Sequence, residues 1–333
     1  MSKKISDIGK KRISPEEVKD FSLSIQKIKD EIAKVFLGHK DIIDSLIRAL
    51  ICNGHVLVEG IPGIAKTLAI MSLAKASGCS AKRIQFTVDI LPTDIIGLTT
   101  YTPNKGFEVV KGPIFVNFLI ADEINGGSPK TQSALIEAMQ ERQVTMGRET
   151  YPLPNPFFVM ASQNPIETEG VYTLPEAQLD RFLFNIVFSY PDRETEELVM
   201  QQNVTFKRFS EYNLKSIVSP KKIIEMQKKV HDVYCDDKIR KYILDIVEMT
   251  RKKNFNYGEY VELGCSPRAN ISIYIASKAE ALMNGRNFVI PKDVKKVAMD
   301  CLRHRIILTY RAYADKLTAD KVIEGILDKV RVD

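Results

Sequence analysis

Three short apolar segments, separated by stretches that suit helices, constrain the fold of this chain more than any other feature. The segments are "HVLVE" at residues 55–59, "NFLIA" at 117–121 and "PFFVMA" at 156–161. Each has the length of a strand and lacks polar alternation, which is typical of strands buried inside a parallel sheet. We therefore predict an α/β fold in which helices cover both sides of a parallel sheet.

A helical part is expected to follow the sheet. From about Asp192 the sequence changes to long, Lys-rich amphipathic stretches with few strand signals. Near the N-terminus, residues 14–17 (Ser-Pro-Glu-Glu) have the pattern of a helix start, and they predict a helix to about residue 35. Residues 41–51 predict a second helix. The expected organisation is an N-terminal helical segment (1–34), an α/β core (35–191) and a helical domain (192–333).

The composition excludes several classes of protein. The 333 residues carry a net charge of +6, and 44% of them are hydrophobic, as in an ordinary globular protein. The five cysteines show no C-x-x-C spacing and form no ligand cluster with the four histidines, so we expect reduced thiols and no structural metal. We find no signal-peptide pattern and no apolar run of roughly 18 residues, and we therefore expect no membrane segment and a cytoplasmic location.

The segment "GIPGIAKT", residues 60–67, follows the first apolar segment and has the outline of a phosphate-binding loop. In such a loop, backbone N–H groups and a helix N-terminus surround phosphate, a lysine adds positive charge and a hydroxyl meets Mg²⁺. Lys66 and Thr67 suit the last two roles. Ala65 stands where the common pattern has a glycine, and we expect it to be tolerated because the loop needs only its N–H group.

Polar residues also follow the second and third apolar segments. Asp122 and Glu123 come directly after "NFLIA", and Asn164 comes shortly after "PFFVMA". Ligands of open α/β sheets bind at the carboxyl ends of the strands, so these side chains are expected near the loop. There, Asp122 would hold Mg²⁺ through water and Glu123 would orient and deprotonate an attacking water. Asn164 would position the same water against the γ-phosphate.

Two arginines have positions that suit contacts with phosphate. Arg181, in "LPEAQLDRFLF", is expected at a helix end. Arg268, in "GCSPRAN", is expected in the first turn of a helix that begins behind Ser266 and Pro267. Taken alone, each arginine is also compatible with an ordinary surface charge.

Together these motifs resemble, in order and spacing, those of an AAA+ ATPase, and in detail those of the MoxR family. The resemblance covers nearly the whole chain after about Val35 and implies an AAA+ αβα core with a parallel sheet, plus an all-α lid domain. The matching segments are "GHVLVEGIPGIAKT", "GPIFVNFLIADEIN", "SPKTQSALIEAMQERQVT", "ASQNPIETEGVYTLPEAQLDRF", "SPRA" and "LRHRI".

The resemblance also implies a role for each candidate residue. Lys66 and Thr67 look like the Walker A pair, and Asp122 and Glu123 look like the Walker B pair. The segment from Phe36 to Lys40 would contact adenine. The residues implied in catalysis are Glu123, Asn164 (sensor 1), Arg181 (arginine finger) and Arg268 (sensor 2). The residues implied in binding ATP are Gly38, His39, Gly60, Ile61, Pro62, Gly63, Ile64, Ala65, Lys66, Thr67 and Leu68, and those implied for Mg²⁺ are Thr67 and Asp122.

Two insertions and one departure complete the resemblance. Residues 91–115 match the insert in the second helix, and residues 142–154 match the hairpin before sensor 1; in related machines both face a central pore. The family usually continues "DEIN" with Arg-Ala, whereas this chain has Gly126-Gly127. The departure puts any contact of that arginine in question, but it leaves the residues expected around the phosphates in place.

The implied function is that of an ATP hydrolase that uses ATP and Mg²⁺ and assembles as a homo-oligomeric ring, expected to be a hexamer. MoxR-like proteins are similar to chaperones that insert metals or activate enzyme complexes. Remodelling or maturation of a client protein complex is therefore expected. A von Willebrand factor A domain protein is the expected partner, and it must be a separate chain, because this sequence shows no such domain.

Other functions stay open on the sequence alone. A nucleic-acid motor, such as a helicase or a restriction translocase, is compatible with the charge of +6, although no zinc finger, winged helix or aromatic-rich module is recognisable. A scaffold that binds ATP without turnover is a third class, against which Glu123, Asn164 and Arg181 argue. A serine hydrolase is disfavoured because no G-x-S-x-G motif occurs.

Overall fold

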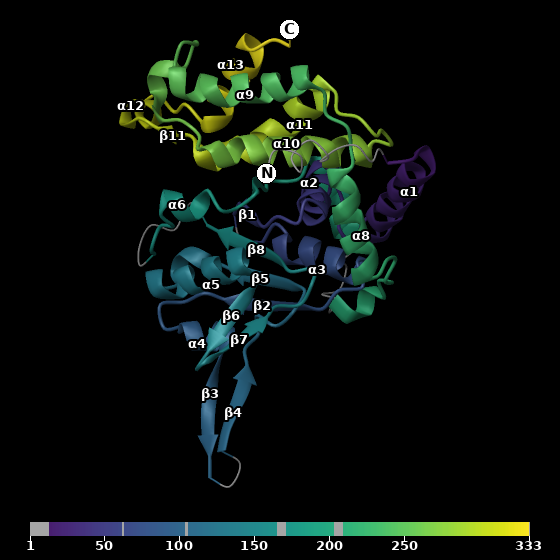
Figure 1. The fold of residues 1–333 in the computed structure, drawn as a ribbon, viewed down its shortest axis with the longest axis vertical. Coiled ribbons are helices and arrows are strands. Elements are labelled where there is room, and N and C mark those ends of the chain that lie inside the picture. Colours follow the sequence, from purple (N-terminus) through teal and green to yellow (C-terminus); the bar gives the residue numbers. More distant parts are fainter. Residues whose placement is uncertain (1–12, 62, 104–105, 165–170, 203–208, 333) are drawn as a thin grey trace, which may run out of the picture. The chain divides into compact units, whose positions relative to one another are not determined.

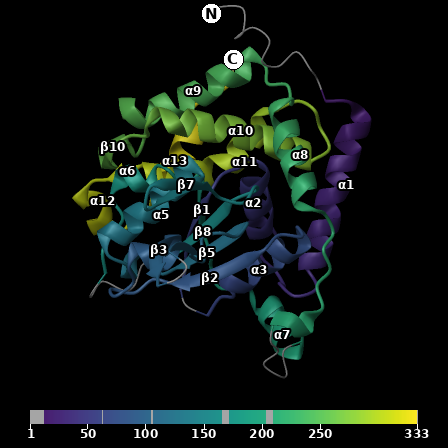
Figure 2. The same ribbon diagram turned by 60° about the horizontal axis from the view of Figure 1, so that its bottom comes forward.

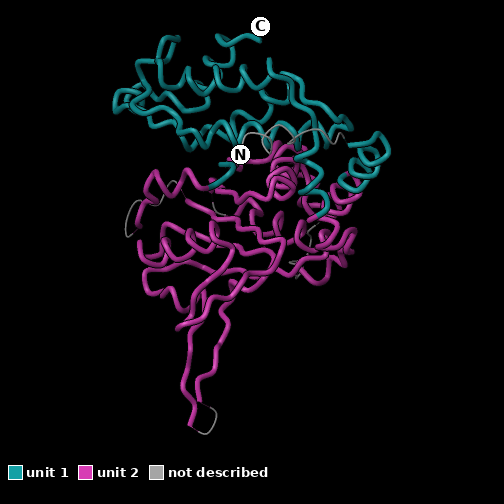
Figure 3. Tube along the Cα trace, in the orientation of Figure 1, with its two compact units in different colours: residues 1–25, 182–185, 225–333 teal, residues 26–181, 186–224 magenta. Residues whose placement is uncertain are grey.

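The computed structural model describes residues 13–61, 63–103, 106–164, 171–202 and 209–332. The chain forms two compact units, shown in different colours in Figure 3. The core unit comprises residues 26–181 and 186–224, and the helical unit comprises residues 1–25, 182–185 and 225–333.

A five-stranded sheet in the order β2-β5-β8-β1-β9 forms the centre of the core unit (Figure 1). Three neighbouring pairs, β2 with β5, β5 with β8 and β8 with β1, run parallel. All five residues of β5 are buried, as expected for a sheet covered on both faces. The predicted parallel sheet is therefore confirmed. The strands are β1 (Val56–Glu59), β2 (Ala81–Gln85), β5 (Phe118–Asp122), β8 (Phe158–Gln163) and β9 (Phe184–Val187), which spans a boundary between the units.

Helices α3 (Lys66–Ala76) and α5 (Pro129–Glu141) connect the strands and lie on opposite faces of the sheet (Figures 1 and 2). The path from β1 to β2 crosses the sheet in one direction, and the path from β5 to β8 crosses it in the other. Because such crossovers are right-handed, the two helices must cover different faces. The side chains that they bury include Ala69, Ile70 and Leu73 of α3 and Leu135, Ile136 and Met139 of α5.

Two antiparallel hairpins extend from the core unit. Strands β3 (Gly97–Thr102) and β4 (Gly106–Lys111) follow the short helix α4 (Pro92–Ile96), and Figure 1 shows that they project away from the sheet. Strands β6 (Gln143–Met146) and β7 (Glu149–Pro152) form the second hairpin. These hairpins occupy the two stretches where the sequence predicts insertions. The other elements of this unit are α2 (Lys40–Ile51), η1 (Ile124–Gly126), α6 (Glu176–Leu179), α7 (Arg193–Gln202) and η2 (Phe209–Tyr212).

Four long helices dominate the helical unit, and one short antiparallel pair of strands accompanies them. Helix α10 starts as the sequence predicts, because Ser266 caps it by accepting a hydrogen bond from the Arg268 N–H and Pro267 occupies its first turn. The elements are α9 (Asp237–Lys252), η3 (Gly258–Tyr260), β10 (Val261–Leu263), α10 (Pro267–Met283), α11 (Pro291–Leu302), η4 (Arg303–Arg305), β11 (Ile307–Leu308), α12 (Tyr310–Ala314) and α13 (Ala319–Lys329).

The boundaries of the two units differ from the expected domain boundaries at residues 34 and 191. Helices α1 (Pro15–Ile32) and α8 (Pro220–His231) each cross a boundary, and residues 186–224 belong to the core unit. Two contacts explain why this segment stays with the core. A Cβ atom on Gly38 would lie 2.6 Å from Cγ2 of Thr195, and the Lys215 N–H donates a 2.7 Å hydrogen bond to Glu31. Among the described residues, no helix is long and apolar enough to cross a membrane.

Ala65 has an unfavourable backbone conformation at the start of α3. It caps this helix with φ 60° and ψ 27°, in the left-handed region. An L-residue there brings its Cβ close to the following carbonyl oxygen, at a cost of about 1–2 kcal/mol, whereas glycine has no Cβ. Alanine at this position therefore has a conformational cost that the sequence did not reveal, although the loop still forms.

His55 connects helix α5 to strand β8 inside the core unit. Its Nδ1 accepts a 3.0 Å hydrogen bond from the Val159 N–H, so its Nε2 carries the proton and donates at 3.0 Å to the Met139 carbonyl. Burial, with a smaller effect from the Arg142 charge, lowers the pKa of His55 to about 3. The folded protein therefore holds this side chain neutral.

Ala65→Gly is expected to raise the free energy of unfolding by about 0.5–1 kcal/mol, because it removes the left-handed strain. The greater conformational entropy of glycine in the unfolded chain offsets part of that gain. Urea denaturation measures the change. The matched control is Ala69→Gly in the same helix, where the backbone is helical and the methyl group is buried. There the same substitution should destabilise by about 1 kcal/mol. Equal losses in both variants would contradict the argument.

Stability is expected to fall as the pH drops below about 6.5. The unfolded chain then protonates His55, whereas the folded chain does so only near pH 3, so the stability that this group contributes is lost between these values. From about pH 7.5 to about pH 5 the loss from His55 is about 2 kcal/mol. The His55→Asn variant has no titrating group at this position, so its free energy of unfolding should fall by about 2 kcal/mol less than that of the wild type over the same pH range. Parallel pH profiles of the two proteins would refute the prediction.

Candidate active site

A polar cavity lies at the carboxyl ends of β1, β5 and β8. It has a volume of about 390 Å³, and it lies where open α/β sheets bind ligands. The structure thus brings together eight residues that the sequence singled out on three separate segments. The residues that line this cavity, here called the phosphate cavity, are Gly63, Ala65, Lys66, Thr67, Leu68, Arg83, Asp122, Glu123 and Asn164.

The loop between β1 and α3 forms one wall of the phosphate cavity. A Cβ atom on Gly60 would lie 2.8 Å from the Phe188 carbonyl oxygen, so only glycine allows this close approach. The Lys66 Nζ donates a 2.7 Å hydrogen bond to the Gly60 carbonyl, which folds the ammonium group over the loop. Helix α3 begins at Lys66, so its N-terminal N–H groups lie where an anion would be bound. Pro62 lies outside the described residues.

The two carboxylates after β5 are held by Ser162 of β8. The Ser162 hydroxyl donates to Oδ1 of Asp122, and the Ser162 Oγ itself accepts a 3.0 Å hydrogen bond from the Glu123 N–H. Glu123 has φ 53° and ψ 53°. A left-handed conformation in a non-glycine residue costs of order 1–3 kcal/mol, and such strain often occurs at functional sites.

Strand β2 adds two residues that the sequence analysis missed. The Gln85 Nε2 donates a 2.5 Å hydrogen bond to Oε2 of Glu123. Arg83 donates to Oδ2 of Asp122 from Nε at 2.9 Å and from Nη2 at 2.6 Å. Their spacing in "AKRIQ" could have indicated both residues, because side chains two residues apart in a strand point to the same side of the sheet.

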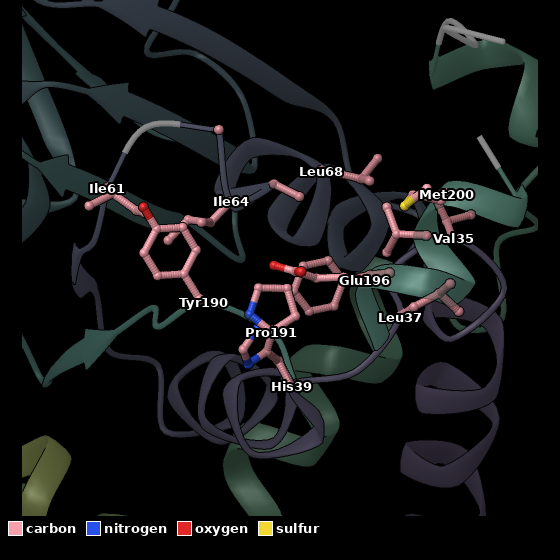
Figure 4. Close-up of a pocket in the computed structure, with 14 residues that line it drawn as sticks. Val35, Leu37, His39, Ile61, Ile64, Leu68, Tyr190, Pro191, Glu196 and Met200 are labelled. Carbon is pink, nitrogen blue, oxygen red and sulfur yellow. The ribbon is translucent and has the colours of Figure 1, made fainter. Parts of the chain in front are cut away.

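A second cavity of about 500 Å³, here called the base cavity, adjoins the phosphate cavity through Gly63, Ala65 and Leu68. Figure 4 shows how side chains from the loop, the segment before α2 and helix α7 surround it. It is mainly apolar, so the pair of cavities matches the two ends of a nucleotide. Its other lining residues are Val35, Phe36, Leu37, His39, Ile61, Ile64, Tyr190, Pro191, Glu196, Val199 and Met200.

The sequence predicted only some of the residues that line the base cavity. His39, Ile61 and Ile64 were expected to contact nucleotide, and they line it. Gly38 does not line it; with φ 70° and a neighbouring Thr195, it shapes the turn that presents His39. The residues from Tyr190 to Met200 gave no signal, because only tertiary folding brings them to the loop.

The phosphate cavity suits Mg²⁺ bound together with phosphate. The Asp122 carboxylate and the Thr67 hydroxyl offer the hard oxygen ligands that this ion prefers. Among the described residues, no cluster of three or more His, Cys, Asp or Glu could hold a metal. An ion here would depend on phosphate and water for its remaining ligands, which is usual for Mg²⁺.

The two candidate arginines are both exposed. Arg181 lies two residues after the end of α6, is exposed, and its N–H donates a hydrogen bond to the Gln178 carbonyl. Arg268 is exposed in the first turn of α10, in the helical unit. Neither is among the residues that line the phosphate or base cavity.

The chain after Arg181 is firmly held within the helical unit. The Arg305 Nη2 donates a 2.6 Å hydrogen bond to the Phe182 carbonyl, and the Arg303 Nη1 donates a 2.5 Å bond to the Asn185 carbonyl. These donors come from the "LRHRI" segment that the sequence matched to the family. They give that segment a structural role next to Arg181.

Gly126 and Gly127 allow a close approach between η1 and the end of β2. A Cβ atom on Gly126 would lie 2.7 Å from the Phe86 carbonyl oxygen, and one on Gly127 would lie 2.6 Å from Cδ1 of the Phe86 ring. Both distances are shorter than real contacts allow. The glycine pair therefore has a packing reason in this chain.

Comparison with known proteins agrees with this geometry. The model of the ATPase family associated with various cellular activities (AAA) matches residues 55–184, and that of the AAA lid domain matches residues 257–326. An ATPase crystal structure from Cytophaga hutchinsonii superimposes with a TM-score of 0.88 at 43% identity, covering 96% of this chain and 97% of that chain.

Similar proteins carry the MoxR name. Chaperone MoxR1 of Mycobacterium tuberculosis is 43% identical over 306 residues, which are 90% of this chain and 80% of that protein. YeaC of Bacillus subtilis, an uncharacterized protein, is 42% identical over 92% of this chain and 94% of its own length. Protein MoxR of Methylorubrum extorquens is 27% identical over 87% of this chain and 89% of its own. This chain therefore belongs to the MoxR family of AAA+ ATPases.

Proposed function

We propose that the chain binds ATP with its base in the base cavity and its phosphates in the phosphate cavity, and that it hydrolyses ATP there. The observation that carries this proposal is the meeting of Lys66, Asp122 and Glu123 in one cavity that continues into an apolar one. Family membership supports ATP hydrolysis in general. The assignment of each residue below rests on its position in the cavity.

Each residue of the phosphate cavity has a role that its chemistry suits. Lys66 and the N-terminus of α3 would bind the phosphates, and Asp122 and Thr67 would hold Mg²⁺. Bound Mg²⁺ would neutralise negative charge on the phosphates. Glu123 would orient the attacking water and accept its proton, and Asn164, only 7% exposed, would fix that water from β8.

Hydrolysis would require a ring of several copies, expected to be a hexamer. Arg181 is exposed and lines neither cavity, so its guanidinium is available to a neighbouring copy. There it would stabilise the charge of the transition state as an arginine finger. Arg268, on the first turn of α10, would act as sensor 2 of its own copy.

The energy of hydrolysis would be used to remodel or mature a client protein. The support is the relative named Chaperone MoxR1 and the exposed hairpin β3–β4, where Tyr101 and Phe107 face solvent. A von Willebrand factor A domain protein would be the partner that presents the client complex. If DNA, and not a co-purifying protein, stimulated hydrolysis, the chain would instead be a nucleic-acid motor.

Lys66→Ala and Glu123→Gln are expected to fail in different ways. The first removes positive charge from the phosphates and should weaken ATP binding by about tenfold or more. The second should preserve binding and lower turnover by about 10²-fold or more, because Gln cannot accept the proton. Titration calorimetry and phosphate release measure the two effects. Lys75→Ala, an exposed position in the same helix, is the control. Normal binding and turnover in both variants would overturn the site assignment.

Arg181→Ala subunits are expected to regain turnover when they are mixed with Lys66→Ala subunits. The first retain an intact ATP site but lack the finger, and the second supply the finger but cannot use ATP. In other systems such an arginine is worth about 10³–10⁵ in rate, so each parent alone should be almost inactive. If mixed rings form but remain inactive, Arg181 does not act across a subunit boundary.

A further inference from the structure

Arg83 occupies one oxygen of Asp122, the carboxylate proposed to hold Mg²⁺. Its Nε and Nη2 both donate to Oδ2, at 2.9 and 2.6 Å. An ionised carboxylate oxygen has about two lone-pair directions, so these two bonds saturate Oδ2. The Ser162 hydroxyl is bonded to the other oxygen, Oδ1. Three donors of the protein itself thus satisfy the carboxylate in this state.

The position of Arg83 is fixed by the sheet. Strand β2 pairs with β5 so that Arg83 stands beside Ile120 and Gln85 beside Asp122. The Arg83 Nη2 also donates a 3.0 Å hydrogen bond to the Gln85 side-chain oxygen, which orients the guanidinium plane toward the carboxylate. The contact between Arg83 and Asp122 therefore follows from the pairing of the two strands.

Charge in the phosphate cavity is balanced only when Arg83 is counted. Two positive side chains, Lys66 and Arg83, face the two carboxylates that line the cavity. A divalent cation at Asp122 would add positive charge next to the guanidinium, and the two cations would compete for Oδ2. Competition is feasible because 52% of the Arg83 side chain is exposed, so water can solvate the guanidinium once it leaves.

We propose that Arg83 is a competing cation at the metal-binding carboxylate: it neutralises Asp122 before metal binds and must give up Oδ2 when Mg²⁺ enters with the nucleotide. Arg83 thereby supports nucleotide binding without metal and opposes metal binding. This inference rests on the proposed binding of ATP at this site.

The test compares ADP affinity in excess Mg²⁺ with ADP affinity in EDTA, measured by titration calorimetry. Arg83→Met should weaken binding in EDTA by about tenfold, because an unpaired Asp122 then repels phosphate. It should leave binding in Mg²⁺ unchanged or tighter, so the ratio of the two affinities should rise by about tenfold. Direct Mn²⁺ titration of the ADP-bound protein should show tighter metal binding in the variant.

Two further variants separate this role from a structural one. Lys82→Met removes the same charge from the neighbouring, exposed position of β2 and should leave the ratio at the wild-type value. Arg83→Lys keeps the charge with a single ammonium group and should give an intermediate ratio; it also serves if Arg83→Met is unstable.

Each outcome decides the question. A loss of ADP affinity by the same factor in Mg²⁺ and in EDTA would show that Arg83 only holds the strand, and it would overturn the competition. Weaker Mn²⁺ binding in Arg83→Met would overturn it as well. If the wild-type protein binds no ADP in either condition, the proposed nucleotide site itself is wrong.

Discussion

The pairing of β8 with both β1 and β5 is the constraint on which the site depends. In this register Ser162 stands beside Val58, one residue beyond the pair formed by Ala121 and Ala161. Its hydroxyl therefore reaches Asp122 and the Glu123 N–H together. A slip of β8 by one residue would turn this hydroxyl to the opposite face of the sheet. The acidic pair would then lose its shared anchor, and Asn164 would leave the edge where Lys66 and Thr67 lie. The apolar burial that fixes the register thus also fixes the chemistry.

Backbone strain accumulates around the two cavities. His39, Ala65 and Glu123 all have positive φ values, of 44°, 60° and 53°, and all line one or both cavities. Each such residue costs of order 1–3 kcal/mol, which the surrounding packing must offset. The conformations have a common effect, since each turns the chain sharply where a strand or loop meets the site. The fold thereby forms the walls of the two cavities at the expense of local stability.

Much of this fold follows from the sequence because its strongest signals are local. Continuous apolar segments predict β1, β5 and β8, and the cap formed by Ser266 and Pro267 predicts the start of α10. Strand β2 gave no such signal: it lies at the sheet edge and only Ile84 of its five residues is buried. Arg83 and Gln85 were missed with it. The left-handed conformation of Ala65 was also out of reach, because the residue pattern permits several backbone paths. The α7 side of the base cavity depends on contacts between segments more than a hundred residues apart, which no periodicity encodes.

The glycine pair after Glu123 affects the site through packing more than through the loss of a charge. The Phe86 N–H donates a 2.8 Å hydrogen bond to the Asp122 carbonyl, so the end of β2 is fixed beside the turn that contains Gly126 and Gly127. Cβ atoms at these two positions would meet Phe86 at 2.7 and 2.6 Å, so the Arg-Ala pair that the resemblance to the family implies would require the turn or the strand to shift. Gln85 precedes Phe86 and donates to Glu123. The contact between the glycines and Phe86 thus lies directly beside the hydrogen bond between Gln85 and Glu123. In this chain the glycines let the end of β2, which carries Gln85, pack directly against the turn that follows Glu123.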